Sequence, residues 1–152
     1  MTTSPDPRIA ARQRWMAVLA RARAAEISAC LAGVAPLPEA AVLRGPEEGL
    51  VMVRGRIGGA GGAFNLGEMS VTRCTVRAGG FIGHATVMGR DGARALLAAR
   101  VDAGLQDGAR HEALQAAVIA PLAARQAAAR AAEAARAAAT KVEFFTLQTM
   151  RT

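Results

Sequence analysis

Residues 64–88 read FNLGEMSVTRCTVRAGGFIGHATVM, and this stretch decides the fold. Two runs of strand-forming residues, 64–77 and 81–88, flank Gly79-Gly80, a dipeptide that favours a tight turn. The connection is too short to hold a crossover helix, so the two strands can only pair antiparallel. Residues 64–88 therefore predict a β-hairpin in the middle of the chain.

The residues before this hairpin predict two more strands, 41–45 and 49–57. They are separated by Pro46-Glu47-Glu48-Gly49, which has the composition of a turn. In the second strand Val51 and Val53 fall on one face, and Arg54 and Arg56 fall on the other. The region 41–88 therefore predicts an antiparallel sheet of about four strands.

Helices are expected on both sides of the sheet. Apolar residues recur at helical spacing over residues 8–33, after a loose tail at residues 1–7, and Gly33 and Pro36 end the pattern. Asp91 is placed to cap a helix, and helices are predicted across residues 91–140. Residues 122–140 are nearly all alanine and arginine, which favour helix strongly. A short extended segment at 142–146 completes an α+β fold, expected as a single domain over residues 1–152.

The composition predicts a core with few aromatic side chains. Hydrophobic residues make up 52% of the chain, yet aromatics make up only 3%, with one tryptophan and no tyrosine. A core of alanine, valine, leucine and methionine buries less area per residue than one built on aromatics. We therefore expect a partner to complete the apolar surface, with Trp15, Phe144 and Phe145 as interface candidates. Phe144 and Phe145 have the alternative of docking on the body of the protein itself.

The net charge of +7 has two interpretations. Arginine can be the default surface cation of an alanine- and arginine-rich chain, or the charge can serve an anionic partner. The arginines are scattered and form no basic tract, so nucleic acid is not the expected partner. A basic adaptor or nucleic-acid-binding protein remains the alternative to the function set out below.

Four arginines are candidates for contact with an anion: Arg54, Arg56, Arg73 and Arg90. Each is predicted to lie on a strand or at a strand end, and guanidinium groups suit phosphate and carboxylate. The glycine cluster at residues 58–62 could also approach a ligand, but it completes no phosphate-loop motif. Solvated strand faces and a plain hairpin loop are the structural alternatives.

Residues for independent catalysis or metal binding are missing from the pattern. His84 could act as an acid or base, but no nucleophile with a supporting acid can be paired with it. Cys30 and Cys74 form no Cys-x-x-Cys pair, so we expect no metal site, reduced thiols and no cofactor bound by this chain. No signal peptide and no apolar run of ~20 residues is found, which predicts a cytoplasmic protein without a membrane span.

Several stretches, taken in order, resemble the PhnG family of carbon–phosphorus lyase subunits. The first, residues 12–20, matches the family's Arg-Gln-x-Trp-Met-x-Val-Leu-Ala. The other blocks are Glu48-Gly49-Leu50-Val51, Arg56-Ile57-Gly58-Gly59, Thr72-Arg73, Gly89-Arg90-Asp91, Ile119-Ala120-Pro121-Leu122 and Val142-Glu143-Phe144-Phe145-Thr146. The ordered set covers most of the chain and is more specific than any of its blocks.

The resemblance implies an accessory subunit of an enzyme complex, with no active site of its own. PhnG-like subunits assemble with H-, I- and J-type subunits and act with an L-type ATPase component. The complex displaces adenine from ATP, supplied with Mg, by a phosphonate, and the J subunit later breaks the carbon–phosphorus bond. On this reading the catalytic groups lie mainly outside the chain, and its arginines could help to hold the triphosphate.

Overall fold

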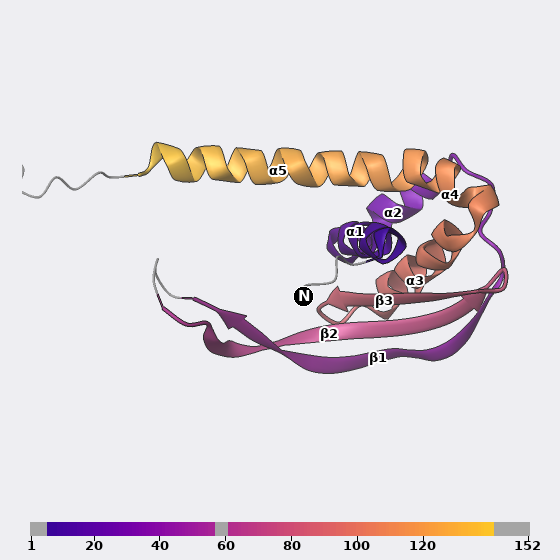
Figure 1. Ribbon diagram of the computed structural model, residues 1–152, viewed down its shortest axis with the longest axis horizontal. Helices are drawn as coiled ribbons and strands as arrows, with labels where there is room; N and C mark the ends of the chain where they lie inside the picture. Colours follow the sequence, from indigo (N-terminus) through magenta and orange to yellow (C-terminus); the bar gives the residue numbers. More distant parts are fainter. Residues whose placement is uncertain (1–5, 57–60, 142–152) are drawn as a thin grey trace, which may run out of the picture.

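The computed structural model describes residues 6–56 and 61–141. Figure 1 shows a long curved sheet, α3 packed on one face of it with α1 alongside, and α5 running across the side away from the sheet. The elements are α1 (Pro7–Arg21), α2 (Ala24–Leu31), β1 (Ala40–Gly55), β2 (Phe64–Ala78), β3 (Phe81–Met88), α3 (Gly92–Gln106), α4 (Gly108–Leu114), a π-helical segment η1 (Gln115–Ile119) and α5 (Ala120–Ala139).

The described part of the chain confirms the α+β class and the central hairpin. The strand order is β1-β2-β3, and both neighbouring pairs are antiparallel. β2 and β3 join through Gly79 and Gly80, whose φ angles of +58° and +85° suit glycine. Residues 142–146, with Phe144 and Phe145, and residues 57–60 of the glycine cluster lie outside the described residues.

The prediction of about four strands was wrong by one, because residues 41–45 and 49–57 are not separate strands. β1 runs from Ala40 to Gly55 and pairs with β2 over its whole length. Its register shifts between Val42 and Arg44 and again between Arg44 and Glu47. The proline- and glutamate-containing segment is thus accommodated as irregularities within one strand, and it does not reverse the chain direction.

The helix expected over residues 8–33 is two helices. α1 ends at Arg21, and Ala22 and Arg23 have extended backbone with ψ near 150°. The Glu26 carboxylate accepts a hydrogen bond from the backbone N–H of Arg23 at 2.9 Å, which caps the start of α2. The break turns the chain so that Leu19, Ala22 and Ile27 are all buried. α1 itself begins at Pro7, capped by Asp6, one residue earlier than expected.

The core lies between α3 and the sheet and is built largely from small residues. Ala95, Ala99 and Ala103 of α3 are fully buried, as are Val76 and Val87 of the sheet. Small side chains let the helix backbone approach the strand closely. The few-aromatic core expected from the composition is therefore a core of close backbone packing, extended by Leu105, Leu114, Val118 and Leu122 from the C-terminal helices.

Thr72 holds the junction between the sheet and α3. Its buried hydroxyl donates a hydrogen bond to the Gly89 carbonyl at 2.7 Å and accepts one from the Asp91 N–H at 3.0 Å. Asp91 in turn caps α3 by accepting from the N–H of Arg94 at 2.9 Å, as predicted from the sequence. The start of α3 is thus tied to the central strand of the sheet.

Replacement of Thr72 by valine is expected to lower the free energy of unfolding by about 1–3 kcal/mol, because the carbonyl of Gly89 and the N–H of Asp91 lose their partner at constant side-chain volume. Urea titration followed by circular dichroism measures the change. Thr86→Val is the matched control, since the same substitution is made at an exposed position of β3. Equal effects in the two variants would contradict the proposed role of the Thr72 hydroxyl.

Candidate functional site

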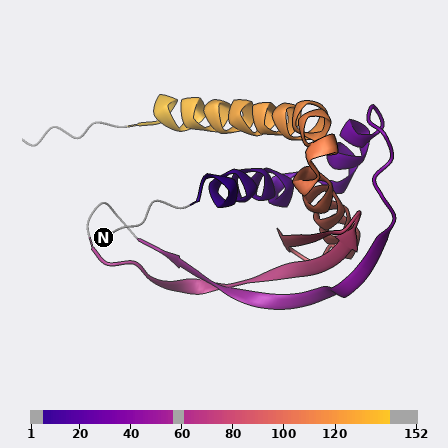
Figure 2. The same cartoon turned by 45° about the vertical axis from the view of Figure 1, so that its right-hand side comes forward.

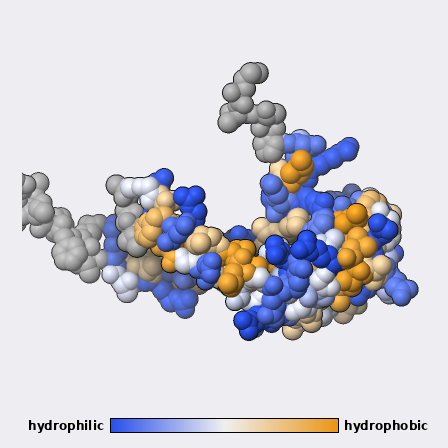
Figure 3. All heavy atoms as spheres, turned by 90° about the horizontal axis from the view of Figure 1, so that it is seen from below, coloured by the Kyte–Doolittle hydropathy of each residue, from blue (hydrophilic) through white to orange (hydrophobic). Residues whose placement is uncertain are grey.

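The distal halves of β1 and β2 form a two-stranded ribbon that projects beyond α1 and α3 (Figures 1 and 2). We call residues 48–55 and 64–70 the apolar ribbon. Leu50 and Met52 of β1 are 64% and 52% exposed. Phe64 and Leu66 of β2 are also exposed, and Figure 3 shows apolar side chains gathered over this part of the molecule. Large apolar side chains that are clustered and exposed mark a surface that another molecule covers.

The apolar ribbon is exposed for two reasons: its strands carry apolar residues on both faces, and α3 does not extend over it. Register pairs Leu50 with Ser70, Val51 with Met69 and Met52 with Glu68, so apolar residues reach both faces. Near the body, one face of the sheet is covered by α3, which buries Cys74 and Val76 of β2. In Figure 1 α3 stops short of the ribbon. The apolar side chains of β1 and β2 in the ribbon therefore have no part of α3 over them and stay exposed to solvent.

α5 is the second exposed element. Leu122 is buried and the side-chain amide of Gln126 donates to the carbonyl of Val18 at 2.9 Å, which fixes the start of the helix on α1. Every residue from 127 to 139 is exposed. Figures 1 and 2 both show α5 extending to the same side of the molecule as the apolar ribbon. A helix of alanine with few contacts of its own can be approached closely by another helix or sheet.

The four candidate arginines do not converge on one site. The guanidinium groups of Arg73 and Arg90 lie 3.9 Å and 3.1 Å from the carboxylates of Glu47 and Glu48 respectively. Arg54 lies seven residues from Glu47 along β1, roughly 23 Å at the rise of an extended strand. Arg54 donates to the carbonyl of Ala63 at 3.4 Å. No carboxylate of the described residues lies within ion-pair distance of Arg54 or Arg56. Arg54 and Arg56 therefore form a basic pair at the far end of the ribbon that has no carboxylate partner in the described chain.

Asp102 is the centre of a buried polar cluster that sequence reasoning missed. Its carboxylate is fully buried and accepts hydrogen bonds from Arg12 Nη2 at 2.7 Å, Trp15 Nε1 at 2.8 Å and the backbone N–H of His84 at 2.9 Å. The cluster joins α1, α3 and β3. The signal for it was present: Arg12 interrupts the apolar stripe of the first helix, and Asp102 is the only acidic residue of α3 and stands between Val101 and Ala103.

Arg12 and Trp15 of this cluster and Leu50 of the ribbon belong to the stretches that resemble one family, and the comparison with known proteins agrees. Residues 10–150 match the family described as Phosphonate metabolism protein PhnG. The chain belongs to the PhnG family. It is 48% identical over 146 residues to the alpha-D-ribose 1-methylphosphonate 5-triphosphate synthase subunit PhnG of Rhizobium meliloti (strain 1021), covering 95% of this chain and 93% of that protein.

Trp15, an interface candidate in this PhnG-family chain, has its ring inside the fold. The side chain is 6% exposed, and its ring meets that of His111 edge-on with centroids 5.6 Å apart. His111 Nδ1 lies 2.7 Å from the carbonyl of Leu105, which suits a donated N–H. Trp15, Phe81 and His111 line a groove of about 650 Å³ near the start of α1. An interface role for Trp15 stays a prediction, and any such role would act through the rim of this groove.

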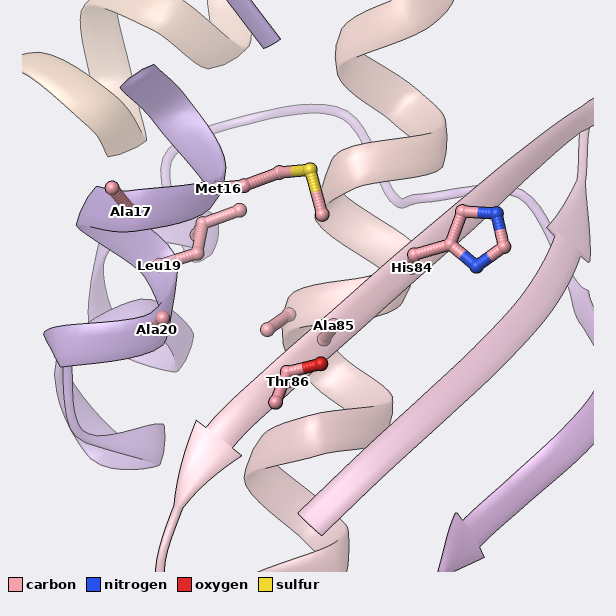
Figure 4. A pocket seen from close by; sticks show the side chains of 8 residues that line it. Met16, Ala17, Leu19, Ala20, His84, Ala85 and Thr86 are labelled. Atoms are coloured by element: carbon pink, nitrogen blue, oxygen red, sulfur yellow. The ribbon is translucent and has the colours of Figure 1, made fainter. Parts of the chain in front are cut away.

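His84, the candidate acid or base, is held by a structural contact. Its Nδ1 lies 3.0 Å from the hydroxyl of Thr75 on the neighbouring strand. A cavity of about 230 Å³ lies beside it, lined by Met16, Leu19 and other small or apolar side chains of α1. In Figure 4 the imidazole points away from the α1 side chains. No carboxylate of the described residues contacts the imidazole, so the pair of Thr75 and His84 lacks the supporting acid of a catalytic triad.

The two cysteines are free. Cys74 is buried, and this burial raises the pKa of its thiol, so the thiolate is disfavoured. Within residues 6–56 and 61–141, no three side chains of histidine, cysteine, aspartate or glutamate are grouped so as to hold a metal ion. The same residues include no helix that is long and apolar enough to cross a membrane.

Proposed function

We propose that this PhnG-family chain is an accessory subunit of the multi-subunit transferase named in its relative, alpha-D-ribose 1-methylphosphonate 5-triphosphate synthase. The observation that carries the proposal is the apolar ribbon, which extends beyond α1 and α3 and whose Leu50, Met52, Phe64 and Leu66 are 45–64% exposed. A subunit surface of this kind is buried on assembly. We propose that the subunit takes part in phosphonate catabolism and acts in the cytoplasm.

The proposed partners are the H-, I- and J-type subunits of a carbon–phosphorus lyase core, with an L-type ATPase component. In this assignment the complex transfers the ribose triphosphate of ATP, supplied with Mg, to a phosphonate and releases adenine. The described residues of this chain support an accessory part in the reaction, because His84 and Cys74 are both held in structural contacts and neither has a catalytic partner.

Co-expression of the tagged chain with its H-, I- and J-type subunits is expected to give a stable stoichiometric complex, measured by affinity purification and native mass spectrometry. Removal of residues 128–152 is expected to weaken or abolish the complex. The cut must follow Gln126, because Leu122 is buried and Gln126 is bonded to α1. Removal of residues 142–152 alone is the companion variant, and it tests Phe144 and Phe145 separately from α5.

The chain lacking residues 128–152 should keep the thermal unfolding midpoint of the full chain to within a few degrees, because the residues from 127 to 139 are all exposed. Its helical circular dichroism should fall only by the part of α5 that is removed. A full-length, folded chain that captures none of the three subunits would overturn the proposed function. Full capture by the chain lacking residues 128–152 would leave the function standing and move the interface to the ribbon alone.

The proposed contact of Arg54, Arg56, Arg73 and Arg90 with the triphosphate stays a prediction. The four arginines fall into two pairs. Arg73 and Arg90 lie beside Glu47 and Glu48, whereas Arg54 and Arg56 have no carboxylate partner in the described chain. We therefore expect any anion contact to fall on Arg54 and Arg56. The Michaelis constant for ATP, measured in the assembled complex carrying Arg54→Gln and Arg56→Gln, tests this contact.

The basic adaptor remains the second candidate function, and local charge pairing weakens it. Seven of the arginines lie within 4.0 Å of a carboxylate: Arg12, Arg23, Arg44, Arg73, Arg90, Arg94 and Arg110. Part of the positive charge is therefore balanced by carboxylates of the described chain, and the chain as a whole keeps its net charge of +7. Saturable, salt-sensitive binding to nucleic acid by the isolated chain would favour the adaptor.

A further inference from the structure

The two edges of the sheet differ in what happens to their outward backbone groups. The N–H of Gly89 donates to the carbonyl of Ser70, so Ser70 points its backbone toward the β3 side of β2. Alternate residues of an antiparallel strand point to alternate neighbours. Met69 and Val71 therefore point toward β1. The register pairs them with Val51 and Gly49. It follows that Gly49, Val51 and Val53 bond to β2, whereas Glu48, Leu50 and Met52 point their backbone N–H and carbonyl groups outward.

The outer edge of β3 is closed by side chains. The N–H of His84 donates to Asp102, and the carbonyl of Ile82 accepts from Arg12 at 3.0 Å and from Gln106 at 2.8 Å. The carbonyl of Met88 accepts from Arg94. α1 lies alongside this strand. These contacts occupy outward groups of Ile82, His84 and Met88 and, with α1 beside the strand, hinder pairing of another chain with β3.

The outer edge of β1 has no such closure among the described residues. No described side chain or backbone group bonds to the outward groups of Glu48, Leu50 and Met52. The register over Glu47 to Val53 is free of bulges, and this stretch holds no lysine and no proline. Natural edge strands are usually protected by such residues or by a covering element. From Glu48 to Val53 the edge of the apolar ribbon is thus a regular strand whose outward backbone groups have no partner among the described residues, and the register shifts between Val53 and Arg54.

We infer that this edge, residues 48–54 of β1, accepts an extended β-strand from another subunit of the complex, with apolar side chains at alternate positions and a carboxylate facing Arg54. The inference rests on the proposed accessory-subunit function. Backbone hydrogen bonds to Leu50 and Met52 would hold the arriving strand, and their side chains would pack against its apolar residues. The carboxylate follows from charge, because Glu48 is already matched by Arg90 at 3.1 Å and Arg54 has no carboxylate partner in the described chain.

A second copy of this chain is the competing occupant. Two-fold pairing of β1 with itself about Val51 would place Glu48 opposite Arg54 and Leu50 opposite Met52. The pairing would also set Arg56 against Pro46, which has no backbone N–H to donate, and it would require Glu48 to leave Arg90 or share it. The unbalanced positive charge at Arg54 and Arg56 is better met by an acidic strand from a different subunit.

Hydrogen exchange of the full chain, alone and in the co-purified complex, tests the inference, because strand addition should protect alternate backbone amides of β1. In the isolated chain the amides of Leu50 and Met52 should exchange rapidly, and those of Gly49, Val51 and Val53 should be protected by β2. In the complex the amides of Leu50 and Met52 should slow by at least about tenfold, as for a backbone group that gains a hydrogen bond. Packing of a partner on the ribbon faces alone would not select alternate residues.

Met52→Pro and Met52→Thr separate the backbone from the side chain. Both substitutions remove the apolar side chain, but only proline removes the outward N–H, and neither touches a bond to β2. Capture of the partner subunits by Met52→Pro should be about tenfold weaker than by Met52→Thr, the size of one lost hydrogen bond with its partner left unpaired. Arg54→Glu should weaken capture of the partner subunits, whereas Arg14→Glu, at an exposed position of α1, should not.

The possible outcomes distinguish strand addition by a partner from self-association, from contact of Arg54 with phosphate and from failure of the proposed function. A complex that forms without the alternating protection, or equal capture by the two Met52 variants, would overturn strand addition and leave the accessory-subunit function intact. Protection of Leu50 and Met52 in the isolated chain that disappears on dilution would identify a second copy as the occupant. Failure of the unmodified chain to bind any subunit would instead overturn the function itself. A raised Michaelis constant for ATP with undiminished assembly in Arg54→Glu would assign Arg54 to phosphate and remove the partner carboxylate.

Discussion

Replacement of Asp102 by alanine is expected to lower the free energy of unfolding by about 3–5 kcal/mol, the range measured when one member of a buried ion pair is removed. The carboxylate is fully buried, and its loss leaves the indole N–H of Trp15 and the backbone N–H of His84 without an acceptor. The guanidinium of Arg12 loses its ion pair and keeps the carbonyl of Ile82 as acceptor. The substitution also separates α1 from the sheet, since the cluster is a polar connection between them. No surface substitution in this chain should have a comparable effect.

Trp15 is the only tryptophan, so its fluorescence reports unfolding of this cluster directly in a guanidinium titration. Glu112→Ala, at an exposed position of α4, is the matched control and should change stability by less than about 0.5 kcal/mol. The double variant Arg12→Met with Asp102→Leu removes both charges and should recover part of the loss. Asp102→Ala with unchanged stability and unchanged fluorescence would show that the cluster does not hold α1 in place.

Replacement of Gly83 by alanine should have the second large effect, a loss of about 3 kcal/mol or more, at the upper end for an overpacked core. A Cβ at this position would lie 1.9 Å from the carbonyl oxygen of Ala99 and 2.8 Å from the backbone nitrogen of Ala103. Both obstacles are backbone atoms of α3, so no side chain can rotate away. The helix must shift on the sheet or the strand must move.

The measurement is thermal and urea unfolding of the Gly83→Ala chain beside Gly33→Ala. Nothing lies within 4 Å of a Cβ added at Gly33, so this control should stay within about 0.5 kcal/mol of the unmodified chain. If Gly83→Ala yields no folded protein, the milder Ala103→Gly, which removes a buried methyl without a clash, still tests whether this contact is tightly packed. Unchanged stability of Gly83→Ala would mean that α3 lies farther from β3 than described.

Local signals explain which parts of the fold could be predicted. The β2–β3 hairpin follows from Gly79-Gly80 between two strand-forming runs, and the start of α3 follows from the capping side chain of Asp91. Both depend on residues close together in the chain. The strand count was overestimated because proline and glutamate near residue 46 indicate a turn locally, whereas pairing with β2 on both sides keeps β1 continuous.

The candidate site shows the same division. The arginines of the strands could be predicted from the sequence. The carboxylates beside Arg73 and Arg90 could not, because the local sequence around Glu47 and Glu48 predicts a turn. The exposed state of Leu50 and Met52 was also hidden. Alternation predicts a strand with two faces, but it does not say where the helix that covers one face will end.

By itself, the sequence determined the family, the α+β class, the central hairpin and the alanine-rich C-terminal helix, since these depend on ordered motifs, periodicity and helix propensity. Only the tertiary structure decided that Arg12 and Trp15 meet Asp102, and that Gly83 lies against the backbone of α3. Only the tertiary structure, too, left the edge of β1 open while closing that of β3. The physical reason is that the Asp102 contacts join residues 90 and 87 positions apart, and the outward backbone groups of a strand are free or bonded according to what packs beside them.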